Sequence, residues 1–369
     1  MPILLLALLT AAADPQPLAP VVVGADAAGK AEAPQLQSLA ASSIARSRFQ
    51  LLDLVDALDP ERAAARGRSQ KEAEAALAGA EKAYNDLDTQ RAGKLADAAV
   101  KAFQQTDLSR TWPGYLRARV LKVACLAASE KPKTIKAELE RLLAIAPDAE
   151  LPPAQFAPDL LAFARRTRQA VQSRGDRLEV KTAPDGAEVW VDGRRRGLAP
   201  LTVRNLGPGE HLLTARFPGS AIFQQPVSGT VVANLEAASR SAAWAAVEKA
   251  AADRDAAIRA AGALAASTGA AQALLVLASR GDKPDAIALE LLRVDAGGAR
   301  VRAQVRGAVP SGQGLAAAAS QWLDAALGPD QVQLVPPEAA AARPPPVPAV
   351  AAATAPPPPR PAGPGEPFA

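Results

Sequence analysis

The feature that most constrains the fold is a run of short alternating segments between residues 178 and 217, separated by glycine and proline. Side chains alternate between apolar and other types in Leu178–Val180, Glu188–Val191, Leu201–Val203 and His211–Phe217. A period of two is typical of strands with one buried face. Glycines stand at the turns between these segments, where a tight turn favours a positive φ. The sequence therefore predicts a small β-sandwich, which we place at residues 176–236.

The turns of this segment carry an ordered set of motifs. Pro184-Asp185-Gly186-Ala187 is followed by Val191-Asp192-Gly193, by Gly197 with Pro200-Leu201, and by Gly209-Glu210-His211. In these positions residues 178–219 resemble the PEGA domain, named for Pro-Glu-Gly-Ala, with Asp185 in the place of Glu. The resemblance implies a non-catalytic, extracytoplasmic β-domain of bacterial surface and envelope proteins, often found beside tetratricopeptide-like repeats.

Residues 67–175 show the spacing of paired helices. Apolar residues recur at helical intervals in 69–88, 91–105, 115–129, 134–145 and 158–172, and Ser69 with Glu72 forms a capping-box pattern. Alanine at the contact positions allows close helix packing, as repeat arrays require. With Ala98, Phe103 and the Ala146-Pro147 step in family-like places, this region resembles the tetratricopeptide-like repeats. Together with the Ala, Arg and Pro content, the combination resembles envelope proteins of myxobacteria and related bacteria.

The two flanking regions alternate strand and helix patterns. Residues 14–66 predict strand, helix and strand, and residues 240–330 predict α-β-β-β-α, beginning with a helix over 242–268 that we expect to break near Gly262. This order resembles the α/β domain at the amino terminus of TolB and in peptidoglycan-synthase activator lipoproteins. The resemblance implies that both chain ends meet in one domain, with the helices and the β-module inserted. The overall expectation is an α+β multidomain protein.

The first residues indicate export. Ile3–Ala13 is an apolar run followed by small residues, which predicts a signal peptide over 1–13, although no Lys or Arg precedes it. A buried strand or a misplaced start is the alternative. The uncharged stretch 260–279 is mostly Ala, Gly, Ser and Thr, so we expect a helix and a strand there and no transmembrane helix in the mature chain. Residues 331–369 are Pro-rich and predict a disordered tail. We expect a periplasmic or secreted protein.

The composition removes many kinds of chemistry. With one His and one Cys, neither a usual zinc site nor a Cys/His dyad is readily built, and a formal charge of +4 is a weak basis for nucleic-acid binding. We therefore expect no enzyme, no catalytic residue, no metal, no cofactor and no nucleic-acid partner. His211 is expected to be structural and Cys125 to be a buried, inert thiol. We interpret Asp53 and Asp56 as a solvated helix surface.

Binding is the remaining class of function. Arg194, Arg195 and Arg196 are expected to project from a hairpin tip next to Trp190, with three guanidinium groups that suit phosphates or carboxylates; a plain solvated turn is the alternative. In the helices we select Tyr84, Phe103 and Tyr115. The sequence favours a scaffold or adaptor that binds envelope proteins. The alternative is a module that binds peptidoglycan or an anionic polysaccharide through Arg194–Arg196.

Overall fold

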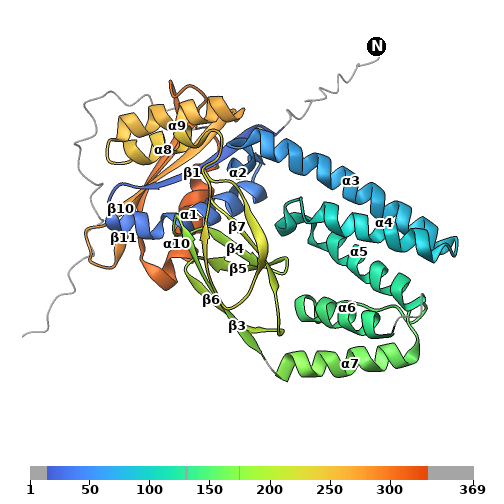
Figure 1. Ribbon diagram of the computed structural model, residues 1–369. Helices are drawn as coiled ribbons and strands as arrows, with labels where there is room; N and C mark the ends of the chain where they lie inside the picture. Colours follow the sequence, from blue (N-terminus) through green and yellow to red (C-terminus); the bar gives the residue numbers. More distant parts are fainter. Residues whose placement is uncertain (1–14, 129–131, 174, 331–369) are drawn as a thin grey trace, which may run out of the picture. The chain divides into compact units, whose positions relative to one another are not determined.

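The computed structural model describes residues 15–128, 132–173 and 175–330 (Figure 1). These residues combine helices with three sheets and contain separate hydrophobic clusters. The expected α+β class is therefore confirmed. The proposed signal peptide and the Pro-rich tail lie outside the described residues.

A five-stranded sheet is built from both flanking regions, in the order β12-β11-β10-β1-β2. Its strands are β1 (Pro17–Gly24), β2 (Gln50–Leu51), β10 (Gln272–Arg280), β11 (Ala286–Asp295) and β12 (Val301–Pro310). β1 runs parallel to β10, with Val21 opposite Leu275. Because β1 and β10 are neighbours, the segments before and after the inserted regions share one sheet. These segments are the two that the sequence analysis placed in a common domain.

Helices cover both faces of this sheet. Because successive strand residues point to opposite faces, Leu18 and Val22 of β1 pack with α1 (Ala27–Arg46) and α10 (Leu315–Ala326). Val21 and Val23 pack on the other side with α8 (Ser241–Ala250) and α9 (Arg254–Thr268). A short 3-10 helix, Gly312–Gly314, precedes α10.

The expected helix break near Gly262 is wrong. The break lies between Ala250 and Arg254, where the Asp253 carboxylate accepts hydrogen bonds from the N–H groups of Asp255 and Ala256 and so caps α9. Gly262 is inside α9 for another reason: a Cβ there would lie 2.1 Å from the Gly298 backbone nitrogen. Gly262 therefore allows α9 to pack closely against the turn between β11 and β12.

The inserted helices contact one another in sequence (Figure 1). They are α2 (Leu54–Ala57), α3 (Pro60–Asn85), α4 (Thr89–Phe103), α5 (Leu108–Ala128), α6 (Pro132–Ile145) and α7 (Pro158–Ser173). Fully buried alanines such as Ala73, Ala92 and Ala96 line their contacts, which allows the helix axes to approach closely. The predicted capping box at Ser69 is wrong, because α3 already begins at Pro60, a residue suited to the first helical position.

The β-module is a pair of sheets with one core. Its sheets have the orders β6-β3-β9 and β5-β4-β7-β8. The strands are β3 (Asp176–Ala183), β4 (Glu188–Val191), β5 (Arg194–Leu198), β6 (Leu201–Leu206), β7 (His211–Arg216), β8 (Phe223–Val227) and β9 (Thr230–Asn234). The core includes Leu178, Val189 and Leu213. The sequence analysis did not predict β5, β8 or β9.

Two turns of the β-module lie against the inserted helices. Gly193 has φ +67°, and a Cβ on it would lie 2.0 Å from the Trp112 ring of α5; a Cβ on Gly207 would lie 2.6 Å from the Ala144 carbonyl oxygen of α6. Arg194, next to Gly193, donates to Asp148 Oδ2 at 2.5 Å. The tip of this hairpin therefore packs on the helices at Gly193, while the side chains of Arg194, Arg195 and Arg196 are exposed.

Candidate functional site

A cavity of about 760 Å³ lies between the β-module and the five-stranded sheet. Its walls come from α1, the outer edge of β1, the β2–α2 segment, the strands β4, β5 and β7, and one face of α8. Pockets that hold small ligands commonly enclose about 300 to 1,000 Å³. Distant parts of the sequence therefore combine to form a space of ligand size.

The β-module wall of the cavity is an aromatic ring flanked by ion pairs. Trp190 lies opposite Arg195 in the β4–β5 register, and Glu188 lies opposite Arg216 in the β4–β7 register. Arg195 donates to Glu188 Oε1 at 2.9 Å and, across the cavity, to Ser38 Oγ of α1 at 2.7 Å. The Arg216 guanidinium lies 5.8 Å from the centre of the Trp190 ring, within the range of a cation–π contact.

The opposite wall is the edge of a strand. β2 is two residues long and pairs only with Pro17 and Leu18. Beyond them, the outer edge of β1 lines the cavity at Pro20, Val22 and Gly24. A proline is tolerated at this edge because its missing N–H would face away from the sheet, so no hydrogen bond to a neighbouring strand is lost.

One side chain of α1 forms hydrogen bonds with the backbone groups at this edge. Gln37 donates from Nε2 to the Pro20 carbonyl at 2.9 Å, and its Oε1 accepts from the Val22 N–H at 3.0 Å. A strand carbonyl and a strand N–H that face the cavity are thus paired with a side-chain amide. Sequence inspection did not single out Gln37, since an amide on a helix face carries no local signal of such a contact.

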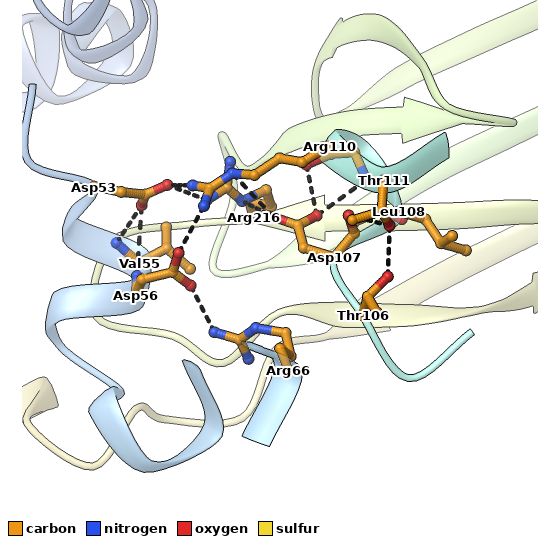
Figure 2. A network of polar contacts seen from close by, with 12 residues as sticks. Asp53, Val55, Asp56, Arg66, Thr106, Asp107, Leu108, Arg110, Thr111 and Arg216 are labelled. Carbon is orange, nitrogen blue, oxygen red and sulfur yellow. Dashed lines mark hydrogen bonds and ion pairs between the residues drawn. The ribbon is translucent and has the colours of Figure 1, made fainter. Parts of the chain in front are cut away.

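A network of three arginines and three aspartates begins at the cavity wall (Figure 2). The Asp53 carboxylate caps α2 by accepting from the Val55 N–H at 2.9 Å, and it forms ion pairs with Arg110 and Arg216. Asp53 and Arg216 also line the cavity. The cavity wall is therefore connected directly to the inserted helices.

The same network extends into α3 and α5. Asp56 accepts from Arg110 Nη1 at 2.8 Å and from Arg66 at 2.7 Å. Asp107 lies 3.4 Å from Arg110 Nε and 3.5 Å from Arg216 Nε. Burial, with a further contribution from the charge of Arg216, lowers the pKa of Arg110 to about 10. Our interpretation of Asp53 and Asp56 as solvated surface is wrong, because both carboxylates hold several segments together.

His211 has a structural environment. Its Nδ1 lies 2.7 Å from Asp192 Oδ2 and its Nε2 lies 2.8 Å from the Gly207 carbonyl oxygen. Both partners are acceptors, so the protonated imidazolium, which donates from both ring nitrogens, is the form that satisfies both contacts. Burial lowers the pKa of His211, but the hydrogen bond and charge of Asp192 and the Gly207 carbonyl raise it more, and the pKa is raised overall. His211 ties together the two turns that contact α5 and α6.

The structure separates the candidate residues into two groups. Trp190 and Arg195 line the cavity, whereas Arg194 contacts Asp148 and Arg196 is exposed. Phe103 and Tyr115 are 2% and 1% exposed and belong to the helical core, so they cannot present a binding surface. Tyr84 is half-buried and packs against the same core. As expected, Cys125 is buried, and burial raises the pKa of its thiol to about 11.

Other residues of the site were missed by sequence reasoning. Besides Gln37, they include Ser38, Asp53, Arg216 and Trp244. The signal that was present was weak: Arg216 and Trp190 fall on the same face of neighbouring predicted strands, given their alternation. Trp244 is 6% exposed, and its Nε1 has no hydrogen-bond partner among the described residues.

Comparison with known proteins identifies one part of the chain. Residues 176–230 match the PEGA domain family, which agrees with the resemblance seen in the turns. PEGA domains are generally found in extracellular or periplasmic proteins. Neither the curated proteins nor the solved structures gave a match to this chain.

No helix among the described residues has the length and apolar character needed to cross a membrane. No group of three or more His, Cys, Asp or Glu side chains within the described ranges is arranged to hold a metal ion. The part of the chain that the comparisons identify is residues 176–230, which match the PEGA domain family.

Proposed function

We propose that this protein is a non-enzymatic scaffold of the bacterial cell envelope, periplasmic or secreted, which binds another envelope component in the cavity beside the PEGA domain. The observation that supports this most directly is the composition of the cavity. Trp190 and Arg195 face a space of about 760 Å³ that three separate regions of the chain enclose. Trp and Arg, together with Tyr, are enriched among the residues that contribute most of the binding energy at protein interfaces.

The inserted helices support the same proposal as a second surface. Helices α3 to α7 form a consecutive array with an alanine-rich core, and we propose that they act in the manner of tetratricopeptide-like repeats. Because Phe103 and Tyr115 are in the core, the array would bind through its polar helix faces. The myxobacterial type of envelope protein remains part of this proposal.

Site-specific photo-cross-linking tests the proposal. A photoreactive phenylalanine analogue replaces Trp190, which lines the cavity, and in a matched protein it replaces Val232, which is 55% exposed and lies outside the cavity lining. On irradiation of intact envelopes, we expect a discrete cross-linked envelope product from position 190 and none of that size from position 232. Equal products from both positions, or none from position 190, would contradict the proposal.

The cellular compartment of the protein is tested by a separate experiment. Amino-terminal sequencing of the mature protein from fractionated cells is expected to find a start at Asp14 in the periplasmic or secreted fraction. A cytoplasmic protein that retains Met1–Ala13 would contradict the envelope assignment.

Binding of peptidoglycan or an anionic polysaccharide is a second candidate function. It is supported by Arg196, which is exposed and forms no ion pair among the described residues, and by Arg195 beside Trp190. Sedimentation with purified peptidoglycan distinguishes this candidate. Substitution of Arg194, Arg195 and Arg196 by Ala is expected to release the protein into the supernatant, and unchanged sedimentation would reject glycan binding through these residues.

A further inference from the structure

The edge of β1 presents hydrogen-bonding groups that another strand can use. β2 ends after pairing with Leu18, and the edge beyond it lines the cavity through Pro20, Val22 and Gly24. An unpaired strand edge is a ready template for an added strand. Here the cavity leaves space beside that edge, whereas β10 covers the opposite edge along Leu18–Gly24.

Gln37 occupies the position that a strand residue would take. Its amide gives an N–H to the Pro20 carbonyl and accepts from the Val22 N–H, at 2.9 and 3.0 Å. In a parallel pair, one residue of the neighbouring strand offers the same two groups, because its N–H and C=O bond to residues on either side of its opposite number. Gln37 therefore substitutes for one residue of a strand that would continue in the direction of β2.

Other groups in the cavity are also suited to a polypeptide. Trp244 Nε1 is a donor without a partner among the described residues, although Trp244 is 6% exposed, and a backbone carbonyl would satisfy it. Asp185 and Glu248 line the cavity, are exposed, and form no ion pair with another described residue. These two carboxylates complement a basic side chain.

We propose that the cavity receives an extended polypeptide segment of another envelope protein, which displaces Gln37 and adds to the edge of β1 as a parallel strand. The segment carries a basic side chain toward Asp185 and Glu248. Recognition of main-chain groups by an exposed sheet edge is an established mode of peptide binding, in which pockets for the side chains provide specificity. This inference rests on the proposed function, since it defines what the cavity binds.

A peptide selection with the full chain tests the inference. Random ten-residue peptides displayed on phage are selected on the wild-type protein, after removal of those that also bind Ser42→Trp. Ser42 is exposed on α1 and lines the cavity, so a Trp there obstructs the space. Ala31→Trp is the matched control, because Ala31 is exposed on the same helix and does not line the cavity.

The selected peptides then report on the added strand. Methylation of the one peptide nitrogen that donates to Pro20 is expected to lower affinity roughly tenfold, because a backbone hydrogen bond is lost and a methyl group is placed against the edge. Gln37→Ala is expected to bind roughly fivefold more tightly, since the peptide no longer has to displace the amide. If the Ala variant does not fold, Gln37→Glu takes its place. It keeps only the acceptor for the Val22 N–H, and it is also expected to bind the peptide more tightly than wild type.

The outcomes separate this inference from the proposed function. Selected peptides whose affinity is insensitive to every N-methylation and to both Gln37 variants would overturn the added strand. The added strand would also be overturned if no peptide is selected although the cross-link from position 190 forms in the otherwise wild-type chain and is lost in the Ser42→Trp variant. Loss of peptide selection together with absence of that cross-link would overturn the proposed function as well.

Discussion

At the residue scale, His211 gives the clearest relation between sequence and structure. It is the single histidine of the chain, and the motifs Val191-Asp192-Gly193 and Gly209-Glu210-His211 supply both ends of one buried hydrogen bond, from Nδ1 to Asp192 at 2.7 Å. The Asp192 carboxylate also accepts from the Leu212 N–H at 2.9 Å. Two motifs of the family pattern are therefore explained by one contact.

Stability is expected to fall as pH rises above 6.5 because of this histidine. The folded pKa of His211 is raised above the ordinary value of 6.5, so the native state binds more protons than the unfolded chain in that range. The contribution is fully present below pH 6.5 and is lost as pH rises through the folded pKa. Urea unfolding of wild type and His211→Gln from pH 5 to 9 checks this.

The wild-type free energy of unfolding should decline through this range more steeply than that of the variant. Parallel pH profiles for the two proteins would show that the imidazole is not protonated in the fold. Asp192→Asn provides the complementary variant, because it removes the negative charge that raises the pKa and should also flatten the profile.

At the element scale, two glycines in helices have opposite roles. Gly67 lies inside α3 with open space where a Cβ would be, whereas a Cβ at Gly262 in α9 would lie 2.1 Å from the Gly298 nitrogen. Helix propensity alone favours Ala over Gly by about 1 kcal/mol at both positions. Packing around each glycine therefore decides whether substitution by Ala raises or lowers the free energy of unfolding.

We expect Gly67→Ala to raise the free energy of unfolding by about 0.5 to 1 kcal/mol. Gly262→Ala is expected to lower it by about 2 kcal/mol, because the backbone of the β11–β12 turn must move to make room for the Cβ. Thermal or urea unfolding of the two matched variants measures both changes. A stabilising Gly262→Ala would contradict the close approach of α9 to the β11–β12 turn.

Some helices and strands could be predicted from the sequence and others could not. The strands β3, β4, β6 and β7 carry alternation and turn glycines within one short segment, so local pattern was sufficient to predict them. The second strand expected in residues 14–66 is present only as the two-residue β2. β8 contains Pro226, which leaves too little pattern for a strand prediction. The predicted end of α3 at residue 88 is close to the observed end at Asn85. Its start at Pro60 was missed because Ser69 with Glu72 offered a capping-box pattern.

The candidate site was less predictable for a physical reason. Trp190 and Arg195 were selected as residues of one hairpin, and they do line the cavity. Gln37, Asp53 and Arg216 join them through contacts between segments that are distant in sequence, which no local pattern encodes. The packing of the Arg194–Arg196 hairpin against Trp112 of α5 and Asp148 of the α6–α7 connection joins segments that are distant in sequence, so no local pattern predicts it.

At the scale of the whole molecule, the network around Asp53 holds the β-module, the helices and the β2–α2 segment together (Figure 2). Asp107 and Arg216 have 8% and 11% of their side-chain surface exposed, so water replaces a lost partner poorly. Arg216→Met is expected to reduce the free energy of unfolding by about 2 kcal/mol.

A surface pair serves as the control for that variant. Arg306 has 53% of its side chain exposed where it contacts Glu290, and Arg306→Met is expected to cost less than about 1 kcal/mol. A double-mutant cycle of Arg216→Met with Asp53→Asn should show a combined loss smaller than the sum of the single losses. Additive losses would indicate that the two side chains do not interact.

The measurement that tests the central claim most directly is the yield of the cross-link from position 190 in the Ser42→Trp and Ala31→Trp backgrounds. Both variants place an indole on an exposed position of α1, but only Ser42 lines the cavity. If the cavity is the binding site, the envelope cross-link disappears with Ser42→Trp and is unchanged with Ala31→Trp. An equal yield in the two backgrounds would contradict the account.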